Sequence, residues 1–229
     1  MLVRIEKPWG EHIVQCSDIM SNQDELINAI KDRVQIFYCD PPWGNGMIKF
    51  FDTLRKKQTN EFSTHLPQNQ IFLERLATLA IQSNAQFICV ENGEKWSKET
   101  EEIFINKGLQ HITTITGFYD KPLKPMKLHL FMAKSYFQKT SGNKLFLLEK
   151  YFNEIVQNKS GFDLVEKAIH CCLGTPNFQK ELRTAGVFDP CCGFGMTAKV
   201  AVKNKMQFFG NEFNSKRLEK TLKVLNNAH

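Results

Sequence analysis

Short β-rich runs alternate with amphipathic helical stretches along the whole chain. The alternation is typical of a mostly parallel α/β sheet, because each parallel strand is reached through a crossover helix. Strands are predicted at 12–16, 34–39, 86–90, 111–119, 128–133, 185–188 and 206–209. Helices are predicted at 23–31, 68–82, 97–107, 144–157, 162–173, 196–204 and 215–226. We therefore expect an α/β fold with a seven-stranded, mostly parallel sheet and helices on both of its faces.

The runs 111–119 and 128–133 depart from this alternation. They are joined by the turn DKPLKP, which is too short for a crossover helix, so we expect an antiparallel terminal hairpin. No stretch between the other elements has the composition of a linker. At 229 residues the chain is near the usual size of one domain, about 100–200 residues. We expect residues 1–229 to form a single domain.

The composition excludes several classes of protein. Hydrophobic residues make up 42% and charged residues 24%, which is typical of a globular chain and not of a disordered one. No apolar run approaches the about 18 residues of a membrane span, so we expect a cytoplasmic protein with no membrane partner. Seven cysteines without a C-x-x-C pair indicate reduced thiols and no metal site. The net charge of +6 permits a nucleic-acid partner.

The segment Asp40-Pro41-Pro42-Trp43 directly follows the predicted strand 34–39. Ligands of open α/β sheets bind at the carboxyl ends of the strands, so this loop lies where a site is expected. The prolines donate no hydrogen bond, which leaves carbonyl and carboxylate acceptors beside one aromatic plate. Such a surface suits an amino group on a planar ring. An ordinary proline-rich turn with an inward-packed tryptophan is the alternative.

A glycine-containing turn, FDPCCGFGMT at 188–197, connects another predicted strand to a helix. Glycine lets a ligand approach the backbone, and the free N–H groups of a helix start favour an anion. Glu212 ends the next strand, 17 residues after Gly195, and an acid at about this spacing commonly binds ribose hydroxyls. The alternative is a tight turn beside a solvated glutamate. Asp18 also follows a strand, and is either a helix N-cap or an acceptor for an adenine amino group.

Taken together, these segments resemble the S-adenosyl-L-methionine-dependent amino-methyltransferases of nucleic acids, in the circularly permuted β class. In that family a D/N/S-P-P-Y/F/W catalytic loop precedes an F-x-G-x-G-type cofactor loop, as DPPW at 40–43 precedes FDPCCGFGMTA at 188–198 here. GFDLVEKAIHCCL at 161–173 resembles the helix that packs on the cofactor. The resemblance covers nearly the whole chain except 135–161, and implies a Rossmann-like fold.

The resemblance implies a role for each matching residue. The target base would be held by the catalytic loop, Asp40, Pro41, Pro42 and Trp43. S-adenosyl-L-methionine would be bound by Asp18, Asp189, Pro190, Cys191, Gly193, Gly195, Thr197, Glu212 and Phe213. Within this set, Glu212 would bind the ribose, Asp18 the adenine, and Asp189, Gly193, Gly195 and Thr197 the methionine end.

The first residue of the catalytic loop bears on the substrate. In the family Asp is usual for the adenine 6-amino group and Ser for the cytosine 4-amino group, so Asp40 favours N6-methylation of adenine in DNA. The expectation is a site-specific adenine DNA methyltransferase of a prokaryote or phage, as in restriction-modification. RNA adenine and DNA cytosine-N4 methylation stay open, as does a non-catalytic, nucleic-acid-binding partner subunit.

The stretch 135–161 is a short basic insert where DNA methyltransferases of this class carry a target-recognition region. We expect phosphate contacts from lysines in and before it, namely Lys121, Lys124, Lys127, Lys139 and Lys144. A solvated lysine face is the alternative. Sequence choice would then need a homodimer, a separate specificity subunit, or the segment 44–66, which its glycines and polar run KKQTNEFSTH predict to be a mobile loop.

Overall fold

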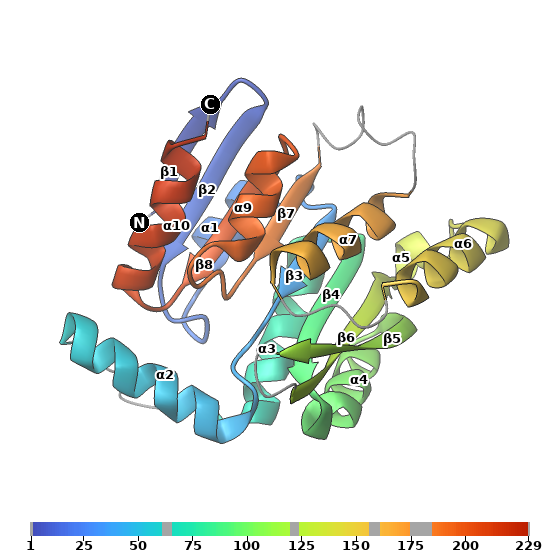
Figure 1. Cartoon of the computed structure of the whole chain (residues 1–229), viewed down its shortest axis with the longest axis horizontal. Coiled ribbons are helices and arrows are strands. Elements are labelled where there is room, and N and C mark those ends of the chain that lie inside the picture. The colour runs from blue at the N-terminus through green and yellow to red at the C-terminus, as the bar shows by residue number, and fades with distance from the viewer. Residues whose placement is uncertain (1, 61–65, 120–123, 156–160, 175–184, 229) are drawn as a thin grey trace.

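The computed structural model describes residues 2–60, 66–119, 124–155, 161–174 and 185–228. Its centre is one eight-stranded sheet in the order β1-β2-β8-β7-β3-β4-β6-β5 (Figure 1). The strands are β1 (Leu2–Lys7), β2 (Gly10–Cys16), β3 (Ile36–Cys39), β4 (Phe87–Gly93), β5 (Leu109–Tyr119), β6 (Lys124–Ala133), β7 (Gly186–Asp189) and β8 (Gln207–Glu212).

Five neighbouring strands of this sheet, β2, β8, β7, β3 and β4, run parallel, as predicted. Strands β7 and β8 come late in the chain but lie between β2 and β3, which is the circularly permuted order. Strand β6 is antiparallel to β4 and pairs with β5, so the expected terminal hairpin is present. Its turn, residues 120–123, lies outside the described residues. The predicted α/β class is confirmed.

The expected number of strands was wrong by one. Strand β1 pairs antiparallel with β2 through a tight turn at Pro8 and Trp9. It is an edge strand, and its residues alternate between half-buried and exposed. Such a strand needs only one weakly apolar face, so its short mixed sequence LVRIEK carries little signal.

Helices cover both faces of the sheet, as expected (Figure 1). One apolar core lies under α6, α7, α9 and α10, and the other lies under α1, α3 and α4. None of the described helices combines the length and the apolar character that a membrane crossing needs. The helices are α1 (Asp24–Ile30), α2 (Gly44–Thr59), α3 (Asn69–Gln82), α4 (Ser97–Asn106), α5 (Lys134–Phe137), α6 (Gly142–Asn153), α7 (Phe162–Leu173), α9 (Met196–Lys203) and α10 (Ser215–Asn226), with a 3-10 turn η1 (Glu94–Trp96).

The segment 44–66, predicted to be a mobile loop, is helical over most of its length. Helix α2 occupies residues 44–59 and lies across the carboxyl ends of the strands (Figure 1), and residues 61–65 are outside the described ones. Its first residue, Gly44, has a φ of +79°, and a Cβ there would lie 2.4 Å from the Trp96 ring. Ile48 is buried. These tertiary contacts stabilise the helix. Its glycines and polar residues do not predict it from sequence.

The expected insert at 135–161 contains α6 and most of α5. Helix α6 packs on β5 and α7, at the edge of the sheet formed by β5 and β6. Lys139 and Lys144 belong to this part of the chain, and Lys121 lies outside the described residues. Lys127 is paired with Glu94, their charged atoms 3.4 Å apart.

Candidate active site

A cavity of about 600 Å³ lies at the carboxyl ends of the parallel strands. Its wall is built by the segments that follow β2, β3, β7 and β8, together with α2 and the start of α7. The residues predicted from sequence that line it are Asp18, Asp40, Pro41, Pro42, Trp43, Lys124, Asp189, Pro190, Cys191, Gly193, Thr197, Glu212 and Phe213. Segments that are far apart in the chain thus meet in one hollow.

Asp40 is the first residue after β3, and its side chain is open to the cavity. The Trp43 indole N–H donates to Asp40 Oδ1 at 3.0 Å, which fixes the carboxylate relative to the ring. The other oxygen, Oδ2, has no hydrogen-bond partner among the described residues. Trp43 is half-buried and packs on Gly93, where a Cβ would lie 3.0 Å from the ring. The loop therefore offers one anchored carboxylate with a free acceptor oxygen.

Glu91 is a second carboxylate in the cavity wall, and the sequence analysis did not identify it. Strands β3 and β4 pair with Cys39 opposite Val90, so Asp40, just after β3, lies level with Glu91 in β4. Glu91 is 1% exposed and accepts a hydrogen bond from the buried Tyr38 hydroxyl. Loss of hydration within the cavity wall and, second, the Glu91 charge raise the pKa of Asp40 well above its usual value, although solvent reaches its side chain.

Asp189 shapes the glycine-containing turn after β7. It is buried, and its two oxygens accept hydrogen bonds from the Cys191 N–H at 3.0 Å and the Thr197 hydroxyl at 2.6 Å. Thr197 lies in the first turn of α9, so the carboxylate ties the end of the strand to the start of the helix. Burial raises the pKa of Asp189 to about 7. The structure thus shows Asp189 bound to its own loop.

Replacing Asp189 with Asn should change how stability depends on pH. The pKa of Asp189 is about 7 in the folded protein against an ordinary 3.8, so the folded state keeps a proton that the unfolded chain releases between these values. Stability is therefore lost as the pH rises through this range. Asp189→Asn should not show this loss of stability. Urea unfolding of both proteins at pH 5 and pH 8 measures the free energy of unfolding. An equal loss in both proteins would contradict the assignment.

Gly193 and Gly195 allow the turn to pass close to α10. Their φ angles are +52° and +77°, and a Cβ on Gly195 would lie 2.9 Å from Thr221 Oγ1. The turn also meets the end of β8, because Glu212 Oε2 accepts the Gly193 N–H at 2.8 Å. Glu212 Oε1 accepts the Asn214 N–H at 2.9 Å. Gly195 itself is not part of the cavity wall.

Glu212 is 5% exposed, and burial raises its pKa above the usual range, opposed by nearby Arg217 and by backbone N–H groups. A carboxylate has about four acceptor sites, so the backbone N–H groups of Gly193, Asn214 and Phe213 leave room for a further donor. Glu212 can therefore bind hydroxyl groups of a ligand in the cavity.

Asp18 lines the cavity just after β2, the strand that pairs with β8, and it is not a helix N-cap. Helix α1 begins only at Asp24, and Asp18 Oδ1 instead accepts the Met20 N–H at 2.9 Å.

Asn211, which was not predicted from sequence, connects the neighbouring loops. It accepts from the Ser17 hydroxyl at 2.7 Å and donates to the Ser17 carbonyl at 3.1 Å.

Cys191 and Cys192 are neutral thiols in this environment. Burial raises the pKa of both well above the ordinary value, and nearby carboxylates raise it further. Since the thiolate is the reactive form of cysteine, neither side chain is suited to be a nucleophile. Cys192 is 4% exposed and faces Gly210, where a Cβ would lie 3.2 Å from its sulfur.

Comparison with solved structures places this architecture among known proteins. The structure is similar to M1.HpyAVI in complex with SAM, at 18% identity and a TM-score of 0.58 over 93% of this chain and 98% of that chain. TTHA0409 of Thermus thermophilus, described as a putative DNA modification methylase and solved with S-adenosyl-L-methionine, has 11% identity and a TM-score of 0.60 over 95% and 94%. The cytosine-N4-specific PvuII DNA methyltransferase has 11% identity and a TM-score of 0.54 over 93% and 92%.

The chain has the methyltransferase fold. The likeness is one of structure, because neither a protein-family model nor a curated protein matches the sequence.

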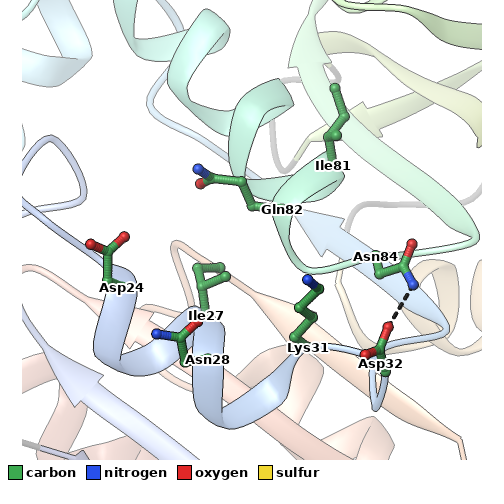
Figure 2. Close-up of a pocket in the computed structure, with 8 residues that line it drawn as sticks. All are labelled: Asp24, Ile27, Asn28, Lys31, Asp32, Ile81, Gln82 and Asn84. Carbon is green, nitrogen blue, oxygen red and sulfur yellow. Dashed lines mark hydrogen bonds between the residues drawn. The ribbon is translucent and has the colours of Figure 1, made fainter.

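A second hollow of about 650 Å³ lies on another side of the methyltransferase fold, between α1 and α3 (Figure 2). It borders the turns that lead into β3 and β4, at the amino ends of these strands. Asn84 donates to Asp32 there at 2.6 Å. The charged residues around it, Asp24, Lys31 and Asp32, are exposed, so this hollow lacks the buried polar groups of the first cavity.

Glu101, His111 and His129 form a cluster on α4, β5 and β6, with one potential ligand atom of each within 4.8 Å of the others. Both ring nitrogens of His129 already have hydroxyl partners, Thr114 at 2.9 Å and Ser97 at 3.3 Å. Burial lowers the pKa of His129 to about 3. The Thr114 hydroxyl also contacts His111 at 2.8 Å, so it occupies the space between the two rings. We interpret the cluster as a hydrogen-bonded network.

Proposed function

We propose that this protein is an S-adenosyl-L-methionine-dependent DNA methyltransferase that methylates the exocyclic 6-amino group of adenine. One observation carries the proposal. The anchored carboxylate of Asp40, with a free acceptor oxygen, shares a single cavity with the glycine-containing turn and the buried Glu212. Methylation of an amino group requires both parts: hydrogen-bond acceptors for the amine, and a binding site for the nucleoside of the cofactor.

The residues of the cavity fit S-adenosyl-L-methionine. Glu212 retains acceptor capacity for ribose hydroxyls, and the buried Nε of Arg217 in the cavity wall has no hydrogen-bond partner among the described residues. An unpaired buried donor is costly, so it indicates a ligand acceptor nearby. We assign the cofactor to the predicted residues that line the cavity, Asp18, Asp189, Pro190, Cys191, Gly193, Thr197, Glu212 and Phe213, with Gly195 shaping the turn behind them. When bound, the cofactor supplies a methyl group made electrophilic by a sulfonium.

The catalytic loop acts on the amine. The lone pair of an aromatic amine is delocalised into the ring, which makes the nitrogen a poor nucleophile. Asp40 Oδ2 and the Pro41 carbonyl accept its two N–H bonds and so localise that lone pair. Trp43 and Pro42 provide the flat wall for the ring. The base must leave its stack or be unpaired to reach this depth.

Cytosine is the second candidate, because the PvuII enzyme among the similar structures is cytosine-N4-specific. Its amine presents the same two N–H groups to the same acceptors. The Asp at the start of the loop favours adenine. RNA adenine methylation would use the same chemistry, and a non-catalytic partner subunit would need neither Asp40 nor Glu212.

The assay supplies labelled S-adenosyl-L-methionine with duplex DNA, single-stranded DNA or RNA, and identifies the modified nucleoside by mass spectrometry. N6-methyladenine in DNA is the expected product. N4-methylcytosine as the product would favour cytosine over adenine as the target base. A modified nucleoside in RNA alone would show that the substrate is RNA and not DNA. Absence of product from every polymer would favour the partner-subunit interpretation.

We further propose that residues 1–229 act as one domain, with 135–161 as a short basic insert. Because this insert is short for a target-recognition region, the working unit would be a homodimer or would use a separate specificity subunit. A cytoplasmic role in prokaryotic or phage restriction-modification is consistent with this chemistry.

Glu91 should control the pH range of methyl transfer. The reaction needs ionised Asp40, so its rate should fall as the pH falls through the raised pKa of Asp40. Glu91→Gln removes one cause of that rise but still accepts the Tyr38 hydrogen bond. The acidic limb of the pH–rate profile should therefore move to lower pH. An unchanged limb would show that Glu91 does not act on Asp40.

A further inference from the structure

Two helices at the cavity, α2 and α10, carry a large excess of positive charge. Helix α2 carries Lys49, Arg55, Lys56 and Lys57 against Asp52, and α10 carries Lys216, Arg217, Lys220 and Lys223 against Glu219. Eight basic residues against two acidic ones equal the whole formal charge of +6. The rest of the chain sums to zero, because the acidic residues elsewhere offset the lysines of residues 120–150. A polyanion would therefore be attracted to this end of the molecule.

The same place exposes large apolar side chains. Phe50 is 54% exposed on α2, and Phe194, in the glycine-containing turn, is 49% exposed. Met47 and Met196 are each 38% exposed beside them and line the cavity. Phe50 does not line the cavity, but it contacts Phe51, which does, at 5.4 Å between ring centroids. Large apolar side chains that are this exposed next to a site indicate a binding surface.

Cations and aromatic rings alternate along this edge. The Arg217 guanidinium lies 4.8 Å from the Phe51 ring and 4.6 Å from the Phe194 ring. The Lys220 ammonium lies 4.5 Å from Phe194. These five residues, Phe50, Phe51, Phe194, Arg217 and Lys220, are called the aromatic rim below. Helices α2 and α10 contact each other, so the parts of the rim that they carry lie side by side (Figure 1).

We propose that the aromatic rim is the docking surface for an unpaired nucleic-acid strand, with bases stacked on Phe50 and Phe194 and phosphates against the cations of α2 and α10. A base in a duplex offers only its edges, whereas an unpaired base offers a face to a ring. Rings interleaved with cations match the alternation of bases and phosphates in a single strand. The inference rests on the proposed function, because it takes the cavity as the site that receives the target base.

The rim differs from the surface predicted from sequence. The lysines of the basic insert, Lys139 and Lys144, lie with α5 and α6 at the β5 edge of the sheet, away from α10 on β8 and β2. Lys127 is engaged with Glu94. Only Lys124 of the described members reaches the cavity. The two surfaces can therefore be tested separately.

The test measures fluorescence anisotropy of a labelled adenine-containing strand of about 15 nucleotides, and of the same sequence as a duplex, without cofactor. The single strand should bind more tightly. Phe50→Ala should weaken its binding by roughly 5-fold or more, the loss of one stacked base. Lys220→Ala should reduce the slope of log affinity against log salt by about 0.7. Phe146→Ala on α6, which is 67% exposed, is the matched control and should change neither value.

Thermal unfolding and cofactor affinity of Phe50→Ala should equal those of the wild type, since the ring is exposed and outside the cavity. Tighter binding of the duplex, equal losses in Phe50→Ala and Phe146→Ala, or no binding of any strand at low salt would each overturn the inference. Weaker binding of the single strand by Lys139→Ala and Lys144→Ala instead would place the strand on the basic insert. Methylation of DNA with any of these results would leave the proposed function standing, and absence of cofactor binding would refute that function instead.

Discussion

Asp40→Ala is expected to lower methyl transfer by at least about 10³-fold, because it removes the only side-chain acceptor proposed for the target amine. The effect should fall on turnover rather than on the cofactor. Asp40 lies on the β3 side of the cavity, and Glu212 with its backbone contacts lies on the β8 side. Calorimetric titration with S-adenosyl-L-methionine should give nearly the wild-type affinity, while the labelled-methyl assay gives the rate.

The matched control is Asp24→Ala, which removes an exposed carboxylate from the start of α1. It should leave the rate within about twofold, because surface substitutions of this kind change stability by about 0.5 kcal/mol or less. A variant Asp40→Ala that still methylates adenine at the normal rate would remove the catalytic loop from the mechanism. A loss of cofactor affinity equal to the loss of rate would show that the loop supports the cofactor instead.

Glu212→Ala is expected to have the second-largest effect, on cofactor binding. A carboxylate that accepts ribose hydroxyls contributes hydrogen bonds of about 1.5–3 kcal/mol, so the affinity should fall by about 100-fold. The substitution also leaves the Gly193 and Asn214 N–H groups without their acceptor. Glu212→Gln keeps one acceptor oxygen, so its cofactor affinity should lie between those of the wild type and Glu212→Ala. Glu219→Ala, an exposed glutamate on α10, is the control and should bind normally.

Cofactor affinity should also depend on pH. Burial raises the pKa of Glu212, and the protonated acid is a weaker acceptor. Affinity should therefore fall as the pH falls through this raised pKa, and Glu212→Gln should remove that dependence. Normal affinity in Glu212→Ala at every pH would show that the ribose binds elsewhere.

The parallel part of the fold and the meeting of the predicted segments in one cavity followed from local sequence signals. Strand 34–39 is almost continuously apolar, and DPPW follows it without a gap, so the strand end and the acceptor loop could be read together. The turn at 188–197 combines a strand end, two glycines and a helix start in the same way. Because parallel strands end at one edge, these separate signals predicted one cavity.

What the sequence analysis missed depends on contacts across the chain. Strand β1 has one paired neighbour and little buried area, so its residues need no strong apolar pattern. Helix α2 has two glycines in its first turn and is rich in polar side chains, and its stability comes from packing by residues such as Gly44 and Ile48. Local propensity is a weak guide where tertiary contacts decide.

Glu91 shows the same limit within the site. It directly follows the apolar run FICV, where an acid is easily taken for the end of a strand that meets water. Only the pairing of β3 with β4 brings it beside Asp40. A signal was present, since the carboxyl ends of neighbouring parallel strands share one edge. Arg217 and Asn211 reach the cavity through similar long-range pairings.

The charge on α2 and α10 has a consequence for kinetics. The field of a polyanion attracts the positive charge that α2 and α10 carry, and it turns the protein before the two surfaces touch. Productive collisions then form a larger share of all diffusional encounters. Dissolved ions shorten the reach of this field to about 8 Å at physiological ionic strength. Added salt should therefore slow the approach of a nucleic acid far more than it speeds its departure.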